Sequence, residues 1–227
     1  MKIRLLVLAN SYKLRHRCIA GIELESGKWL RPLSPTTDKG QIPLTESSMP
    51  GGGQPRPLDV VEIEVSPIKA EYADFYSPED CCLERSTWSF VYRWENTSLL
   101  RQFVSQSDYL LHSKVKFVRQ GYLMQLPFEE RRTLELREVT QFQVLHERDE
   151  SGLTRYLSKI HYLGIDQAVN LKITDVQLRD QMNQGLTGSL GTGFVCLSLA
   201  LPLEDQEGNS DASKRYKLVA SWIPLNE

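Results

Sequence analysis

The segment from residue 3 to residue 33 constrains the fold more than any other part of the chain. An apolar run at Ile3–Leu8 leads into a polar, cationic stretch, and a second apolar run follows at Cys18–Leu24. The chain then turns at residues 25–27 and returns through Lys28–Leu33. Short apolar runs bounded by turn residues predict strands, and the Glu-Ser-Gly turn predicts a hairpin. We therefore expect a β-barrel with a binding edge, with positive charge and one aromatic side chain gathered at one end.

Strand-type runs continue through the rest of the sequence. Leu58–Val65 alternates between apolar and acidic residues, which is the pattern of a half-exposed strand. Further candidates share an apolar character and lie at Val115–Val118, Leu134–Val139, Phe142–Leu145, Leu153–Ile160, Val169–Ile173, Phe194–Leu201 and Tyr216–Ile223. From Pro32 to Pro57 stand six of the eleven prolines and three consecutive glycines, which predicts a long irregular loop. Loops of this length in compact domains are more often functional or mobile than neutral.

Two short helices are expected among these strands. Ser98–Leu111 carries apolar residues at helical spacing after Thr97. Thr174 and Asp175 are placed to cap a second helix that ends at Gly185. Several strands and one short helix thus occur twice along the chain. The sequence predicts a mostly β fold of two barrels in tandem, residues 1–95 and 96–227, with the boundary somewhere within residues 85–112.

The net charge of −2 gives the whole chain no general attraction to polyanions, but the charge is unevenly distributed. Residues 1–40 hold eight Lys and Arg against three acids, while the remaining residues hold 19 against 26. A basic end on an acidic body can steer a polyanion to one face. The alternative is a solvated loop in which the cations cluster by chance.

The cysteines are Cys18, Cys81, Cys82 and Cys196, and no pair has the spacing of a metal site or an obvious bridge. Four free thiols indicate a reducing compartment. No leader-like segment opens the chain, and no run approaches the roughly 20 apolar residues of a membrane helix. We therefore expect a cytoplasmic protein that does not associate with a membrane.

Three short groups of residues carry a resemblance to a known family: Ala9-Asn10-Ser11-x-Lys13, Cys18-Ile19-Ala20-Gly21 and Trp29-x-Arg31-Pro32. Weaker support comes from Leu58–Glu62, Pro78–Asp80 and Tyr216–Ala220. The sequence resembles the bacterial proteins that carry a dual OB-containing domain, which is two oligonucleotide/oligosaccharide-binding barrels in tandem. The resemblance implies two OB-like barrels and a binding role, and it implies no catalytic residues.

A cluster of cationic and aromatic residues near the N-terminus is the candidate nucleic-acid-binding site: Tyr12, Lys13, Arg15, His16, Arg17, Trp29 and Arg31. OB-type grooves hold single strands by pairing cations with phosphates and by stacking bases on aromatic rings. In the alternative interpretation, Trp29 is a core residue, Arg31 is an ion-pair partner at a strand edge and the other cations are simply solvated. Asn10 and Ser11 follow a strand directly, and they could bind a ligand or bond their own backbone in a turn.

No pattern in the sequence indicates catalysis, a metal or another cofactor. The histidines His16, His112, His146 and His161 lack the spacing of metal ligands, and no nucleophile elbow is present. The glycine-rich segment Gly188–Gly193 lacks the lysine of a phosphate loop and runs from a helix into a strand, so it is expected to be a turn.

The function that these patterns favour is a non-catalytic module that binds single-stranded RNA or DNA through the first barrel. The second hypothesis is a protein-docking subunit of a larger nucleoprotein or defence complex. A weaker third hypothesis is a protein that senses nucleotides or another small ligand. A continuous positive groove on the first barrel would favour nucleic acid, whereas scattered charge would favour docking.

Overall fold

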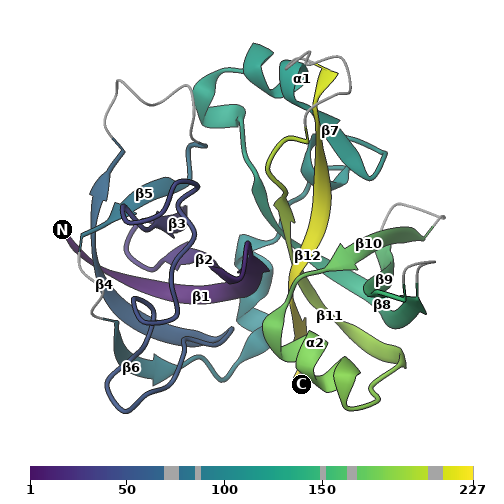
Figure 1. Ribbon diagram of the computed structural model, residues 1–227, viewed down its shortest axis with the longest axis horizontal. Helices are drawn as coiled ribbons and strands as arrows, with labels where there is room; N and C mark the ends of the chain where they lie inside the picture. The colour runs from purple at the N-terminus through teal and green to yellow at the C-terminus, as the bar shows by residue number, and fades with distance from the viewer. Residues whose placement is uncertain (69–76, 85–87, 149–151, 163–167, 204–211, 227) are drawn as a thin grey trace. The chain divides into compact units, whose positions relative to one another are not determined.

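The chain divides into two compact units, Met1–Asn96 and Thr97–Glu227. The computed structural model describes residues 1–68, 77–84, 88–148, 152–162, 168–203 and 212–226. About half of these residues lie in strands, and far fewer lie in helices (Figure 1). Each unit is built around its own barrel.

The first unit is a closed five-stranded barrel. Its strands are β1 (Lys2–Lys13), β2 (His16–Glu23), β3 (Trp29–Leu33), β4 (Asp59–Pro67) and β5 (Asp80–Leu83). They pair in the order β1-β2-β3-β5-β4, and pairing of β4 with β1 closes the ring. All pairs are antiparallel except β3 with β5. A further strand, β6 (Ser89–Arg93), lies along β4 outside the ring.

The interior of the first barrel is filled by the inward side chains of these strands. Alternate residues of β1 and β4, such as Leu5 and Ile63, are buried there together with the fully buried Trp88. Ile42, from the proline-rich loop, is also fully buried in this core. The loop between β3 and β4 is therefore anchored to the barrel through an apolar side chain.

The second unit repeats the same topology with longer strands. Its barrel strands are β8 (Leu134–Arg148), β9 (Thr154–Tyr162), β10 (Val169–Ile173), β11 (Gly188–Leu199) and β12 (Lys214–Pro224). They pair in the order β8-β9-β10-β12-β11, and β11 pairs with β8 to close the ring. The short strand β7 (Phe117–Arg119) adds to β12. In the core, the rings of Phe142 and Trp222 stack with centroids 4.5 Å apart.

Short helical segments accompany the second barrel. They are the 3₁₀ turns Thr97–Phe103, Leu110–His112 and Phe128–Glu130 and the α-helices α1 (Gln120–Gln125) and α2 (Val176–Asn183). The two units share one strand order and a five-stranded, Greek-key closure, which is the OB architecture. The expected fold class, mostly β with two OB-like barrels, is confirmed.

The two barrels differ in the connection between their third and fourth strands. In the second barrel this connection contains α2, which lies at one end of the barrel and buries Leu178 and Met182 in the core (Figure 1). In the first barrel the equivalent connection is residues 34–58, which contain no helix. The proline-rich loop thus occupies the position in the first unit that a capping helix occupies in the second.

The predicted cap of α2 is confirmed. Asp175 accepts a hydrogen bond from the Leu178 amide (3.0 Å) and another from the Trp222 amide (2.9 Å), which ties α2 to β12. Burial raises the pKa of this carboxyl to about 6, although both amides act to lower it. The helix ends close to Gly185, whose φ of +105° a residue with a side chain rarely adopts.

Several boundaries predicted from the sequence are corrected. Gly188–Gly193 is not a turn but the first half of β11, where register shifts at the glycines accommodate bulges. Gly193 also permits close packing, because a Cβ atom there would lie 2.4 Å from the Ile223 carbonyl oxygen. Leu134–Val139 and Phe142–Leu145 form one continuous strand with a bulge between them. The helix expected over Ser98–Leu111 consists of two separate 3₁₀ turns.

All four cysteines are free thiols. Within the described residues, no three His, Cys, Asp or Glu side chains gather as a metal site would require. The described helices are all too short or too polar to cross a membrane.

Candidate functional site

The cationic segment near the N-terminus forms the tip of a long β-hairpin. Strand β1 does not end at Leu8, as expected, but continues to Lys13, and its last residues pair with the start of β2. Tyr12 lies opposite Arg17, and Lys13 lies opposite His16. The connection is a two-residue turn, Leu14-Arg15. Five of the predicted site residues are therefore brought together: Tyr12, Lys13, Arg15, His16 and Arg17.

The turn at the tip has an unusual sequence for its conformation. Leu14 and Arg15 both have positive φ, 49° and 69°, as a type I′ hairpin turn requires. Such turns favour Asn-Gly or Asp-Gly, because side chains on two successive left-handed residues are strained by about 1–3 kcal/mol. Here both side chains are exposed, and the Leu14 side chain is 53% exposed. The hairpin thus holds an apolar and a cationic side chain in solvent at an energetic cost.

Below the turn, a cation and an aromatic ring are stacked. The Arg17 guanidinium lies 4.6 Å from the centroid of the Tyr12 ring. Both side chains are half-buried, and the arrangement fixes the direction of a long, flexible cation. The tip therefore presents a preformed pair of the kind that contacts a phosphate and an adjacent base.

The proline-rich loop supports this hairpin along its length. Lys13 donates to the Lys39 carbonyl (2.6 Å), and the Arg17 and Ile42 backbones exchange two hydrogen bonds of 2.8 and 2.9 Å. Asn10 donates from its side-chain amide to the Pro55 carbonyl (2.7 Å). Ser11, 5% exposed, donates to the Cys18 carbonyl at 3.4 Å. Asn10 and Ser11 thus hold the loop and the hairpin, and their side chains are buried.

Trp29 and Arg31 are not brought to the tip. Trp29 pairs with Ile22, which is six residues along β2 from His16, so the two ends are about 20 Å apart. Trp29 is half-buried at the start of β3. The expected gathering of the aromatic residue with the cations is corrected by this register, because the β2–β3 turn lies at the opposite end of β2.

Arg31 is engaged inside the first unit. Its Nε lies 2.6 Å from a carboxylate oxygen of Asp80, and the two side chains are 9% and 4% exposed. Burial alone would lower the pKa of Arg31, but the carboxylates of Asp80 and Glu79 raise it above its ordinary value. The Arg31 amide also donates to the Glu79 carbonyl at 2.7 Å. Arg31 thus fixes β3 against the start of β5.

Sequence reasoning missed Leu14 as part of this site. Its signal in the sequence was a Leu-Arg pair flanked by residues that continue a strand pairing, without the Asn or Gly that a tight turn normally contains.

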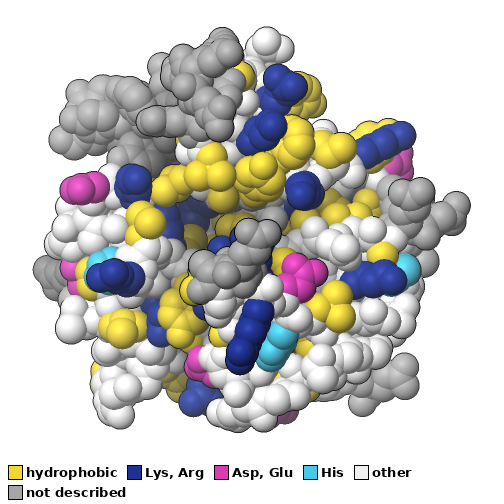
Figure 2. All heavy atoms as spheres, turned by 45° about the vertical axis from the view of Figure 1, so that its right-hand side comes forward, with side chains coloured by type: hydrophobic (Ala, Val, Ile, Leu, Met, Phe, Trp, Pro, Cys, Tyr) yellow, Lys and Arg dark blue, Asp and Glu magenta, His cyan; other side chains and the backbone are white. Residues whose placement is uncertain are grey.

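Lys and Arg side chains on the face drawn in Figure 2 lie in several separate groups, with apolar and uncharged side chains between them.

Comparison with known proteins places the chain among OB folds. The family model for the dual OB-containing domain matches residues 3–222. No curated protein matches the sequence. Among solved structures, a murine DNA-binding protein bound with double-stranded DNA is 10% identical and matches over 97% of this chain and 100% of its own. Its TM-score of 0.26 is too low to support an argument about fold or function.

Proposed function

We propose that this chain, which belongs to the family of dual OB-containing domains, is a non-catalytic module that binds a single strand of nucleic acid at the tip of its first hairpin. OB barrels as a class bind oligonucleotides and oligosaccharides, often through the loop between their first two strands. That loop in the first barrel is the Leu14-Arg15 turn. The proposed contacts are Tyr12, Lys13, Arg15, His16 and Arg17, with Leu14 at the apex.

The observation that carries this proposal is the strained turn. A turn that served only to connect two strands would be more stable with Asn-Gly, so the presence of Leu and Arg at positive φ supports a role for their side chains. Arg15 and Arg17 supply charge for phosphates, and the ring of Tyr12 supplies a face for a base. Trp29 and Arg31 lie outside the proposed interface, because Trp29 pairs at the opposite end of β2 and Arg31 is buried against Asp80.

A second function, docking to a partner protein, is favoured by the side chains of the tip. Leu14 is an exposed apolar side chain at the apex, and Lys13 is already engaged by the Lys39 carbonyl. An exposed apolar side chain at the apex suits a contact with a protein better than a contact with phosphates. This function would lead if the purified chain retained no single-stranded RNA or DNA at low salt.

Salt dependence tests the proposed nucleic-acid contacts. Affinity for a short single strand should fall as salt rises, with a log–log slope of about −0.7 per phosphate neutralised. In the double variant Arg15→Ala/Arg17→Ala, the slope should become shallower by about 0.7 to 1 unit per lost contact. Lys28→Ala, an exposed cation at the other end of β2, is the matched control and should leave the slope unchanged. An unchanged slope in the double variant would remove these residues from the interface.

Replacing the turn itself separates stability from binding. The variant Leu14→Asn/Arg15→Gly should have a free energy of unfolding about 1–3 kcal/mol higher than that of the wild type, because Asn-Gly adopts positive φ with little strain. Its affinity for the single strand should nevertheless fall. Urea unfolding and fluorescence anisotropy with a labelled oligonucleotide measure the two effects. A stabilised variant that bound as tightly as the wild type would contradict a role for the tip.

A further inference from the structure

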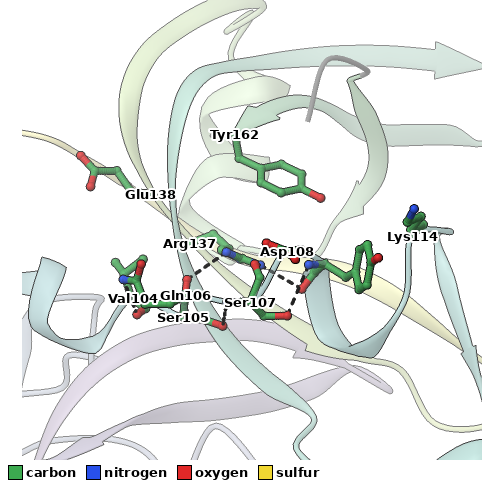
Figure 3. Close-up of a pocket in the computed structure, with 10 residues that line it drawn as sticks. Val104, Ser105, Gln106, Ser107, Asp108, Lys114, Arg137, Glu138 and Tyr162 are labelled. Atoms are coloured by element: carbon green, nitrogen blue, oxygen red, sulfur yellow. Dashed lines mark hydrogen bonds between the residues drawn. The ribbon is translucent and has the colours of Figure 1, made fainter. Parts of the chain in front are cut away.

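The second unit contains a pocket of about 440 Å³, which shares no residue with the hairpin tip. One wall is the extended segment Val104–Tyr109, and the others come from β8 and from the last residue of β9 (Figure 3). Its lining is mainly polar and includes Asp108, Tyr109, Lys114, Arg137, Glu138 and Tyr162. This volume lies within the range of sites that hold small organic ligands.

A buried arginine holds the pocket in shape. Arg137, 6% exposed, donates to the carbonyls of Ser105 and Tyr109 (both 2.9 Å) and to that of Ser107, and it pairs with Glu135. The second carboxylate oxygen of Glu135 accepts from the Leu111 amide at 2.6 Å. The carbonyls of three alternate residues of the segment therefore accept hydrogen bonds from one guanidinium. The pocket wall is preorganised without any ligand.

One polar group in this pocket, the Tyr162 hydroxyl, is not engaged by the residues that the structure describes. Tyr162 is 6% exposed, and its side chain extends over Arg137 with the hydroxyl directed toward the side of Lys114 (Figure 3). The ring lies 5.4 Å from the Arg137 guanidinium. No hydrogen bond joins this hydroxyl to any residue that the structure describes. A phenol is protonated at neutral pH and can donate, and burial raises the pKa of this hydroxyl further.

The charges around the pocket are separated. Glu138 is engaged by Arg101 at 2.8 Å and points away from Tyr162 (Figure 3). Lys114 is exposed, lies 5.1 Å from the centroid of the Tyr109 ring, and forms no ion pair with the described residues. Asp108, on the segment itself, contributes an exposed carboxylate. A ligand that fits both Lys114 and Asp108 carries an anionic end and a separate hydrogen-bond donor.

We propose that this pocket binds one nucleotide. The phosphate lies at Lys114, the base packs against the rings of Tyr109 and Tyr162, and the Tyr162 hydroxyl donates a hydrogen bond to the nucleotide. A base supplies a flat apolar face for the rings and an amino group for Asp108. A lone inorganic anion would gain from Lys114 but would meet the Asp108 carboxylate, and a neutral sugar would leave Lys114 unused. The nucleotide is either free or one unit of a bound strand.

The test titrates the full-length chain with AMP, with inorganic phosphate and with a short single strand. Tyr162→Phe should weaken AMP binding by about 5–10-fold, the loss of one hydrogen bond, and Lys114→Ala by a similar factor. The matched controls are Tyr122→Phe and Lys172→Ala, exposed side chains of the same unit outside the pocket, and both should bind as the wild type does. Tyr162→Phe should melt at the wild-type temperature or slightly above it, because the hydroxyl forms no hydrogen bond with the described residues.

The possible outcomes are distinct. AMP binding that falls in Tyr162→Phe and Lys114→Ala establishes a site for a free nucleotide. If only the single strand binds, and its affinity falls in these two variants but not in the controls, the pocket holds one nucleotide of a strand. The proposal is overturned if phosphate binds as tightly as AMP, or if neither variant changes the binding of any probe. Arg15→Ala/Arg17→Ala should not alter AMP binding, so failure of the hairpin site would not be mistaken for failure of the pocket.

Discussion

Replacing Asp80 with Asn should lower the free energy of unfolding of the first unit by about 3–5 kcal/mol, because it removes the carboxylate that pairs most closely with a buried guanidinium. The wild-type pair is short, 2.6 Å, and both side chains are more than nine-tenths buried. The other Asp80 carboxylate oxygen accepts from the Ser77 amide at 2.8 Å, a bond that the amide oxygen of Asn can retain. The expected loss therefore comes from the missing charge rather than from a changed shape.

Urea unfolding measures this loss, and hydrogen exchange locates it in β3 and β5. The control is Glu62→Gln, which breaks the pair between Glu62 and Lys2. These two side chains are 40% and 71% exposed, so the substitution should lower the free energy of unfolding by less than about 1 kcal/mol. A second control removes both charges. Arg31→Met/Asp80→Asn should be more stable than Asp80→Asn alone, because the buried guanidinium is then removed together with its partner. If Asp80→Asn cost no more than Glu62→Gln, the buried pair would have no special role in the first barrel.

Much of the architecture follows from apolar patterning. The alternation of Leu58–Val65 and the run at Val169–Ile173 became strands near their predicted bounds, and the cap at Asp175 began a helix where expected. These features depend on local chemistry, namely side chains that alternate between faces and an acceptor placed at a helix N-terminus. The repetition of several strands in each half was enough to predict two barrels. Strand order was not predicted, because it depends on pairings between distant residues.

The predictions from sequence were wrong where polar residues or glycines lie in strands. Residues 9–13 carry no alternating apolar pattern, so they were expected to form a loop, yet the hairpin pairing extends β1 through them. Gly188–Gly193 contains three glycines, so its side chains form no pattern that predicts a strand. The segment is a strand because it pairs with β8 and, at Gly193, with β12. Arg31 was expected at a binding edge, but its partner Asp80 is 49 residues away in sequence. Nothing local to Arg31 indicates that pairing.

The same limit applies to the pocket. In Leu134–Val139 the polar residues Glu135 and Arg137 alternate with leucines, a pattern that predicts a solvated face. The segment Ser105–Leu111 covers that face, so both side chains are buried and become each other's partners. Tyr162 lies two residues beyond the strand predicted at Leu153–Ile160, at the end of β9, and the sequence gives no sign that its hydroxyl lacks a protein partner. Sites that require two distant segments to meet are visible only once the fold is known.

Arg137→Met should lower the free energy of unfolding of the second unit by about 3–5 kcal/mol and should also remove the pocket. The substitution leaves Glu135 buried without the arginine and leaves the carbonyls of Ser105, Ser107 and Tyr109 without their donor. Lys217 compensates Glu135 only in part: burial lowers its pKa to about 8, although Glu135 acts to raise it, and its ammonium group donates to the Ser113 carbonyl at 2.6 Å. The segment Val104–Tyr109 should then lose hydrogen-exchange protection before the barrel strands do.

Arg137→Lys distinguishes the geometry of this interaction from its charge. A lysine keeps the positive charge beside Glu135, but its single ammonium cannot span the carbonyls that the planar guanidinium bridges, so it should recover less than half of the lost stability. The matched control is Arg101→Met, which breaks the more exposed pair with Glu138 and should cost about 1 kcal/mol or less. Calorimetry and hydrogen exchange measure both variants. Full rescue by lysine would mean that the charge of Arg137 matters and that its contacts to the segment do not, and the preorganised pocket wall would then need another explanation.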